Sequence, residues 1–242
     1  MTIIEAKESL KLNGYCDFEL KDFSEELYNT ILEKKYCINN EEYLKNFRLI
    51  RFDYHSGDSD VHIQSHDICE SNLIAKEKIK EILNKYDKEY IAQIWLECPN
   101  NLNYKTDVDI FYKILSCFYP GKEKDVNIGM QWTCYSEGCF LKNHNDGQGE
   151  EYQNMCAILI YLNEEWNESW GGNLILRTET SADSTETGYK IVPKFGKVAI
   201  IDLETFDKAH AVEDVIGDHN RFAFIGFAIS KTKRKKLDKI PA

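Results

Sequence analysis

The spacing of apolar and polar positions changes near the middle of the chain. In the first half, Phe23 to Lys34 and Ile74 to Tyr86 place apolar side chains at helical spacing, with Ser24 as a candidate cap of the first segment. Between them, Phe47 to Tyr54 alternates as a strand does and runs into the polar segment from His55 to Asp67. We therefore predict two amphipathic helices, one strand and a polar loop in this half.

From about residue 107 onward, short apolar runs rich in β-formers follow one another, separated by clusters of Gly, Asn, Asp and Ser. This pattern is typical of a β-sandwich or barrel. Thr178 to Gly188 has almost no apolar content, which predicts an exposed loop. The predicted strands are Ile110 to Phe118, Met130 to Tyr135, Phe140 to His144, Cys156 to Leu162, Asn173 to Arg177, Val198 to Leu203, Ala209 to Val212 and Arg221 to Ile229.

The chain has no convincing linker or internal repeat, so we predict one domain over residues 1–231. Within it, residues 1–106 are expected to support the fold and recognise the substrate, and residues 107–231 to form a mainly β catalytic core. Residues 232–242 form a basic tail. The run from Lys231 to Lys239 is interpreted as a solvated terminus, with an address or docking segment as the alternative.

Charge and composition exclude several classes of partner. Thirty basic and 41 acidic side chains give a net charge of −11, which opposes the electrostatic attraction on which non-specific nucleic-acid binding depends. No apolar run approaches a membrane span, the start does not resemble a secretory signal, and the eight cysteines form no C-x-x-C. We therefore expect a cytoplasmic protein with reduced thiols and without a nucleic-acid or membrane partner, whose oligomeric state stays open.

The first candidate for chemistry is His144-Asn145-Asp146. In a strand, residues two positions apart project from the same face about 6–7 Å apart, so an imidazole and a carboxylate can converge on one ion while Asn145 points away. A chance His-x-Asp match is common in a chain with six histidines, so this motif is weak evidence by itself.

Two later residues strengthen the metal interpretation. His210 lies on another predicted strand, and Arg221 opens an apolar strand eleven residues later. Two His and one carboxylate are the ligand set of non-haem Fe(II) oxygenases, which leaves three coordination positions open. An arginine in an apolar strand is costly to bury without a partner, and a carboxylate is its natural partner. Arg221 thus predicts an acidic co-substrate, and its parity places it with Ala223, Ile225 and Phe227 on the inner face.

With these residues in order, the segment from about Trp132 to Ser230 resembles the 2-oxoglutarate/Fe(II) dioxygenases, and within them the prolyl-hydroxylase-like branch. The resemblance implies a double-stranded β-helix, a jelly-roll or cupin-like core, with helices packed against it. The residues that carry it are Tyr135, Gly138, His144-x-Asp146, Ile160 to Asn163, Trp166, Gly171-Gly172, Leu174, Pro193, His210-x-Val212 and Arg221.

The resemblance also implies a role for each site residue. It implies that His144, Asp146 and His210 bind the iron, and that Arg221 holds the distal carboxylate of 2-oxoglutarate with help from the Tyr135 hydroxyl. Ile160 stands where prolyl hydroxylases can carry a second tyrosine. The remaining residues that the resemblance assigns to the co-substrate pocket, together with Ile160, are Leu174 and Val212.

The activity that the resemblance implies is hydroxylation of an unactivated C–H bond. Fe(II), 2-oxoglutarate and O2 would be required, succinate and CO2 released, and ascorbate is a candidate reductant. The expected substrate is a prolyl or other amino-acid side chain, in a protein or as a free amino acid. Relatives that halogenate lack the carboxylate ligand, so Asp146 favours hydroxylation.

Two other functions are compatible with part of the sequence. A cupin-like binding or sensing module would keep the barrel without oxidation, but it would have no reason to retain His144, Asp146, His210 and Arg221 together. Repair of alkylated nucleic acid by the same chemistry is disfavoured by the net charge of −11 and by the lack of a second arginine close after Arg221.

A competing cluster and a turn motif receive simpler interpretations. His62 and His66 have the spacing of a zinc helix, but Ile63 stands where a metalloprotease has glutamate, so we interpret this segment as a flexible polar loop near the active-site mouth. Trp166 and Trp170 are interpreted as packing residues, and Gly171-Gly172 as a turn with positive φ. The rest of the competing cluster is His55, Asp58 and Asp60.

Overall fold

The helices lie mainly in the first half of the chain. The computed structural model describes residues 1–39, 48–56, 59–64, 91–97, 104–135, 137–146, 152–179 and 186–233. Helix α1 starts with a capping box, in which the side chains of Thr2 and Glu5 each accept a hydrogen bond from the other residue's backbone amide. The described helices are α1 (Ile3–Asn13), α2 (Leu20–Phe23), α3 (Glu25–Asn39), α6 (Tyr104–Phe118) and the 3-10 helix η2 (Glu168–Trp170).

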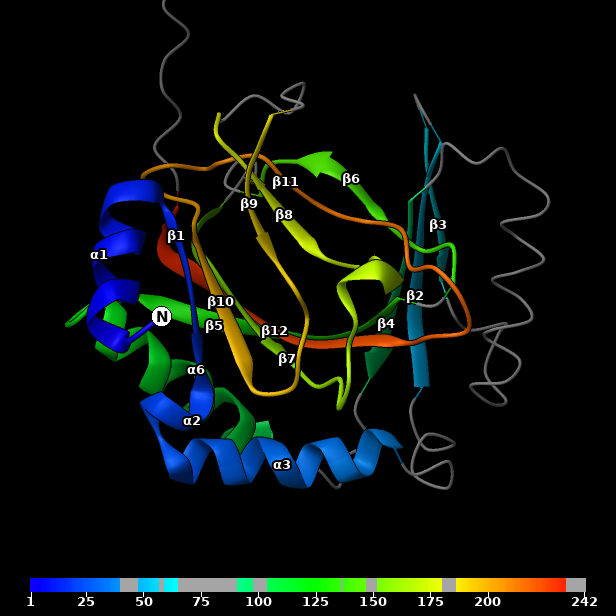
Figure 1. Ribbon diagram of the computed structural model, residues 1–242. Coiled ribbons are helices and arrows are strands. Elements are labelled where there is room, and N and C mark those ends of the chain that lie inside the picture. The colour runs from blue at the N-terminus through cyan, green and yellow to red at the C-terminus, as the bar shows by residue number, and fades with distance from the viewer. Residues whose placement is uncertain are drawn as a thin grey trace, which may run out of the picture.

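Two antiparallel sheets make up the rest of the fold (Figure 1). The larger sheet has eight strands in the order β1-β10-β7-β12-β5-β4-β2-β3, and the smaller has four in the order β6-β11-β8-β9. The prediction of a mainly β fold with supporting helices is therefore confirmed. The strands are β1 (Tyr15–Glu19), β2 (Arg48–Ser56), β3 (Ser59–Gln64), β4 (Ile91–Glu97), β5 (Val126–Tyr135), β6 (Leu141–His144), β7 (Tyr152–Tyr161), β8 (Leu174–Arg177), β9 (Thr187–Ile191), β10 (Lys197–Asp202), β11 (His210–Val212) and β12 (Arg221–Lys233).

Strand β12 lies at the centre of the larger sheet, between β5 and β7. Its side chains alternate between the two faces, and Phe224 packs on the helix side with its ring centroid 4.7 Å from that of Phe111 in α6. Gly226 leaves the room that this contact needs, because a Cβ there would lie 2.4 Å from the Phe111 ring. The helices thus cover one face of the larger sheet and leave the other to the smaller sheet.

Helix α6 replaces a strand that the sequence predicted over Ile110 to Phe118. That prediction is wrong. The buried residues Ile110, Phe111, Ile114 and Leu115 follow a spacing of three and four, which belongs to one face of a helix. The run is short and mostly apolar, so its β-rich composition outweighed its period in the sequence interpretation.

Several other expectations for the first half can be compared with the structure. The helix predicted over Phe23 to Lys34 is confirmed as α3, with the Ser24 hydroxyl accepting from the Leu27 amide at 3.3 Å. The strand predicted over Phe47 to Tyr54 is confirmed as β2. The helix predicted over Ile74 to Tyr86 lies outside the described residues.

The structure also contains strands that the sequence did not predict. Strand β1 pairs with β10, and β9 begins within the segment that was expected to be an exposed loop. Strand β3 forms a hairpin with β2, so the loop interpretation is wrong for residues 59–64. Four of the eight strands of the larger sheet, β1 to β4, therefore come from the first hundred residues. This sharing favours our proposal of one domain over residues 1–231.

Two ion pairs connect α3 and α6, and they differ in burial. Lys34 binds Asp107 with both side chains buried, and the Lys34 ammonium also lies 5.9 Å from the centroid of the Phe224 ring. Lys113 binds Glu26 at 2.9 Å with both side chains exposed.

No helix within the described ranges is long and apolar enough to cross a membrane.

The difference in burial predicts unequal contributions to stability. Asp107→Ala removes the buried carboxylate that binds Lys34, and we expect the free energy of unfolding to fall by about 3–5 kcal/mol. Glu26→Ala breaks the exposed pair between the same helices and should cost less than about 1 kcal/mol. Urea denaturation of both variants measures the difference. Equal losses in the two variants would contradict the assigned role of the buried pair.

Candidate active site

Three potential metal ligands come together at one end of the smaller sheet. His144 is the last residue of β6, His210 is the first of β11, and the two are register partners across this strand pair. Asp146 follows β6 and lies between the imidazoles: its Oδ1 is 3.4 Å from His144 Nε2 and its Oδ2 is 3.3 Å from His210 Nε2. The predicted face-sharing of residues 144 and 146 thus brings both toward the third ligand.

These three residues satisfy the geometric requirement for a metal site. One ligand atom from each lies within 4.8 Å of the others, and within the described ranges this is the one group of three such residues. His210 is buried, whereas His144 and Asp146 are partly exposed, so the group has one face toward solvent or a ligand. Two imidazole nitrogens and one carboxylate oxygen could therefore hold a single ion.

Neighbouring polar groups fix the orientation of the three side chains. His210 Nδ1 lies 3.2 Å from the carbonyl oxygen of Lys208, and a proton on Nδ1 leaves Nε2 free to bind a metal. The Asn145 amide donates to the Asp207 carbonyl, and the Asn154 amide donates to the Asp146 carbonyl at 2.8 Å. The turn after β6 is thereby attached both to the segment that precedes β11 and to β7.

The electrostatic environment keeps Asp146 ionised. Burial would by itself raise the pKa of its carboxyl group, but hydrogen bonds with His144 and His210 lower it, and the net pKa lies well below its ordinary value. The carboxylate is therefore available as a ligand at neutral pH.

The triad borders a cavity of about 230 Å³ between the two sheets. Arg221 lies at the other end: a Cβ on Gly172 would be 3.0 Å from Arg221 Cδ, so the glycine admits the arginine side chain. The predicted inward face of Arg221, Ile225 and Phe227 is confirmed. The residues that line the cavity are Gln131, Tyr135, Leu141, His144, Asp146, Ala157, Leu159, Leu174, Ile201, His210, Val212, Arg221, Ile225 and Phe227.

Arg221 is buried without a carboxylate partner among the residues that the structure describes. Its guanidinium carbon lies 5.0 Å from the ring centroid of Tyr135 and 5.1 Å from that of Tyr161, and the residue is only 1% exposed. Its Nη2 reaches the Tyr161 hydroxyl at 3.5 Å, while its Nε has no hydrogen-bond acceptor in the described part of the chain. A buried cation with an unused donor fits an acidic ligand from outside.

The second tyrosine near Arg221 is Tyr161, which the sequence interpretation missed. Ile160 is not among the residues that line the cavity, and its register partner Phe224 packs against α6, so this side of β7 faces the helices. A shift of one residue reverses the face of a strand. Tyr161 shares the face of Ala157 and Leu159, which line the cavity, so the tyrosine beside Arg221 is Tyr161, and the position expected for Ile160 is wrong. Burial raises the pKa of both Tyr135 and Tyr161, which keeps their hydroxyl groups neutral.

Three other residues that were expected to contact the co-substrate lie at the cavity. Tyr135, Leu174 and Val212 all line the cavity. Tyr135 and Arg221 are register partners across β5 and β12, which explains why their side chains lie next to each other.

The expected packing residues and turn are also found. Trp166 donates its indole N–H to the Gly171 carbonyl at 2.9 Å, and its ring packs against Trp170. Gly171 and Gly172 have φ values of 65° and 62°, as a turn with positive φ requires. The turn has a further role that the sequence did not indicate, because Gly172 provides the space next to Arg221.

The competing cluster of histidines does not form a zinc helix. His62 lies in strand β3, opposite Asp53 of β2, and His55 lies opposite Asp60. Strand geometry removes the helical i, i+4 relation that a zinc helix needs. Asp58 and His66 lie outside the described residues.

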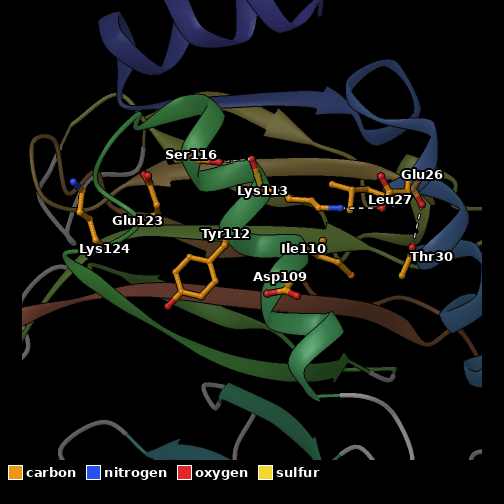
Figure 2. Close-up of a pocket in the computed structure, with 10 residues that line it drawn as sticks. All are labelled: Glu26, Leu27, Thr30, Asp109, Ile110, Tyr112, Lys113, Ser116, Glu123 and Lys124. Atoms are coloured by element: carbon orange, nitrogen blue, oxygen red, sulfur yellow. Dashed lines mark hydrogen bonds and ion pairs between the residues drawn. The ribbon is translucent and has the colours of Figure 1, made fainter.

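A larger hollow of about 610 Å³ lies at the surface between α3 and α6 (Figure 2). Its walls include the exposed pair Lys113 and Glu26, together with Tyr112 and Glu123. It is on the helix side of the larger sheet, whereas the cavity of the triad is on the opposite side. No group of three potential metal ligands occurs there among the described residues, so the candidate chemistry belongs to the smaller cavity.

Comparison with known proteins agrees with this geometry. A family model described as the 2OG-Fe(II) oxygenase superfamily matches residues 130–228, which include the triad, Tyr135, Tyr161 and Arg221. The fold is similar to that of a prolyl-4-hydroxylase from Pseudomonas putida, with a TM-score of 0.58 and 14% identity over 95% of this chain and 99% of that one.

Two further solved structures share the fold. One is a prolyl hydroxylase from Trichoplax adhaerens in complex with a peptide fragment of the hypoxia inducible factor oxygen degradation domain; the TM-score is 0.56 and the identity 15%, over 95% of this chain and 89% of that one. The other is EvdO2 from Micromonospora carbonacea var. aurantiaca complexed with 2-oxoglutarate, with a TM-score of 0.54 and 13% identity over 97% and 93% of the two chains.

At these identities the structural likeness concerns the fold, which is the double-stranded β-helix that the sequence resemblance implied. The sequence match covers the part of the chain that forms the cavity. Fold and sequence therefore both show similarity to the 2OG-Fe(II) oxygenase superfamily, as the sequence resemblance implied.

Proposed function

We propose that this oxygenase hydroxylates a C–H bond of an amino-acid side chain, with a prolyl residue of a protein as the preferred substrate. The observation that carries the proposal is the arrangement of one cavity: a triad of metal ligands at one end and a buried arginine without a carboxylate partner among the described residues at the other. A free amino acid is the second substrate class that we consider.

The triad fits ferrous iron. His144, Asp146 and His210 provide two imidazole nitrogens and one carboxylate oxygen within 4.8 Å of one another. That set occupies one face of an octahedral ion and leaves three positions for other ligands. We assign His144, Asp146 and His210 as the iron ligands.

The opposite end of the cavity fits one carboxylate of 2-oxoglutarate. Arg221 offers a forked set of N–H donors, of which Nε has no acceptor among the described residues. Tyr161, 3.5 Å from Arg221 Nη2, and Tyr135 place two neutral hydroxyl-bearing rings around the guanidinium. We assign Arg221 as the residue that holds the distal carboxylate, with Tyr135 and Tyr161 beside it and with Leu174 and Val212 as apolar walls.

When bound, the ferrous ion supplies the site at which O2 and 2-oxoglutarate react, with one oxygen atom entering succinate, the other entering the hydroxylated substrate, and CO2 released. The residues of the chain prepare this reaction. Asp146 remains ionised, the Lys208 carbonyl fixes the His210 imidazole, and Arg221 orients the co-substrate. Ascorbate is included as a candidate reductant that would restore oxidised iron.

The substrate proposal is supported by the apolar walls of the cavity. Ala157, Leu159, Ile201, Ile225 and Phe227 line it and suit an aliphatic side chain or a prolyl ring. Two proteins of the same fold are prolyl hydroxylases, and one of them was solved with a peptide. Asp146 occupies the carboxylate position of the triad, which favours hydroxylation over halogenation.

The assignment of His210 predicts loss of both metal chemistry and turnover in His210→Ala. Without oxygen, the wild-type protein should develop a visible charge-transfer absorption band on addition of Fe(II) and 2-oxoglutarate. In His210→Ala the band should be absent and succinate formation should fall to background, while circular dichroism stays unchanged because the ligand lies at the cavity rather than in the packed core.

A second histidine provides the matched control for that experiment. His219 stacks on Trp170 with ring centroids 3.8 Å apart and does not line the cavity. His219→Ala should keep the absorption band and the turnover. If His210→Ala retains normal succinate production, the assignment of this ligand is incorrect.

The assignment of Arg221 predicts a selective loss of co-substrate affinity. Arg221→Lys keeps the positive charge but removes the forked donors, and losing one charge-assisted hydrogen bond should weaken 2-oxoglutarate binding by about 10- to 100-fold. Titration of the charge-transfer band with 2-oxoglutarate measures this affinity. Arg177→Lys, at an arginine that binds Asn143 and does not line the cavity, should leave the affinity within about threefold. An unchanged affinity in Arg221→Lys would refute the assignment.

A further inference from the structure

We propose that Gln131 is a specificity residue whose carboxamide hydrogen-bonds an uncharged amide group of the primary substrate, next to the carbon that reacts. The proposal rests on the function proposed above and deepens it, because it selects between the two substrate classes left open there. It favours a residue within a peptide over a free amino acid.

Gln131 is the polar lining residue that remains after the other polar groups are assigned. It lies in β5 opposite Ile225 of β12, and both residues line the cavity. The triad is assigned to iron, and Arg221 and Tyr135 to 2-oxoglutarate. Every other residue that lines the cavity is aliphatic or phenylalanine, so hydrogen bonding to a third molecule falls to Gln131.

The carboxamide of Gln131 has unused hydrogen-bonding capacity. Its side chain is half-buried, and neither its strand partner Ile225 nor Leu159, which pairs with Ile225 from the other side, has a polar side-chain atom. No hydrogen bond joins this carboxamide to a residue in the described part of the chain, although it has two N–H donors and an acceptor oxygen. Polar groups that are removed from water without a partner are unfavourable, so a ligand that covers this carboxamide is favoured if it pairs with it.

The register of the strands places Gln131 toward the metal end of the cavity. Along β5 it lies four residues from Tyr135, the strand partner of Arg221, which corresponds to about 13 Å. The triad lies on the same side, because the Asp146 carbonyl accepts a hydrogen bond from Asn154, which pairs with Ile229 near the far end of β12. A group that contacts Gln131 is therefore near the metal and distant from the Arg221 guanidinium.

The charged residues of the cavity determine which kind of substrate group can bind next to Gln131. Asp146 and Arg221 are the lining residues with a fixed charge, and both are assigned to iron and co-substrate. The ammonium and carboxylate of a free amino acid would have no other charged partner among these residues, and burying them without one is expensive. A peptide amide or carbonyl is neutral and pairs with a carboxamide at both donor and acceptor.

The test compares blocked and free amino acids as probes of the anaerobic complex with Fe(II) and 2-oxoglutarate. The probes are the N-acetyl amides of L-proline, L-leucine and L-asparagine and the three corresponding free amino acids. Binding is read from the change that each probe causes in the charge-transfer band. We expect at least one blocked probe to bind the wild type tenfold or more tightly than its free counterpart.

The variant is Gln131→Met, which keeps length and approximate volume but removes the carboxamide. This variant should bind the preferred blocked probe at least tenfold more weakly than the wild type does, and its affinity for 2-oxoglutarate should be unchanged. The control is Gln153→Met, at a glutamine of β7 that borders a surface hollow beside Lys124 and does not line the cavity; it should behave as the wild type.

Several results would overturn the proposal. The free amino acids could bind as tightly as the blocked probes or more tightly, or no blocked probe could change the absorption band. Gln131→Met could bind the blocked probe with unchanged affinity. That variant could also lose affinity for 2-oxoglutarate, which would assign Gln131 to the co-substrate. Failure of the proposed function is distinguishable from all of these, because no charge-transfer band would then form in the wild type before any probe is added.

Discussion

The antiparallel register of β12 between β5 and β7 decides which side chains of the larger sheet face the cavity. With Arg221 opposite Tyr135, and Ile225 opposite both Gln131 and Leu159, one inward face is formed by three strands at once. A slip of one residue would turn Arg221 toward the helices and bring Phe224 into the cavity. The packing of Phe224 and Gly226 against α6 opposes such a slip, since only this register leaves room for the ring of Phe111.

In the smaller sheet, the positions of the two histidines also depend on strand register, but the paired segment is shorter. His144 and His210 face one another across β6 and β11, two short strands that contribute little pairing energy by themselves. Their positions are stabilised by contacts with the rest of the fold, including the hydrogen bond from Asn154 of β7 to the Asp146 carbonyl and the close approach of Gly172 to Arg221. The two ends of the cavity are thus connected to opposite ends of strand β12, which separates the His144–Asp146–His210 triad from the Arg221 guanidinium.

Much of this arrangement could be predicted from the sequence. The His-x-Asp spacing indicated His144 and Asp146, a later predicted strand supplied His210, and Arg221 was recognised as a charged residue in an apolar strand. The errors have physical causes. Ile110 to Phe118 is a short apolar run in which helix and strand are hard to distinguish by composition. Ile160 and Tyr161 are adjacent and both buried, so only the pairing of β7 with β12 shows which one faces the arginine.

The residue that sequence reasoning had least means of finding is Gln131. A glutamine in a β-strand is usually interpreted as facing solvent, and its inward orientation follows only from its pairing with Ile225. Its importance depends on the placement of the charges. If Asp146 and Arg221, the fixed charges of the cavity, hold the metal and the co-substrate as we propose, selection of the substrate depends on shape and on neutral hydrogen bonds. A family that shares the charged residues can therefore differ in substrate through neutral positions such as this one, which a motif of charged residues does not reveal.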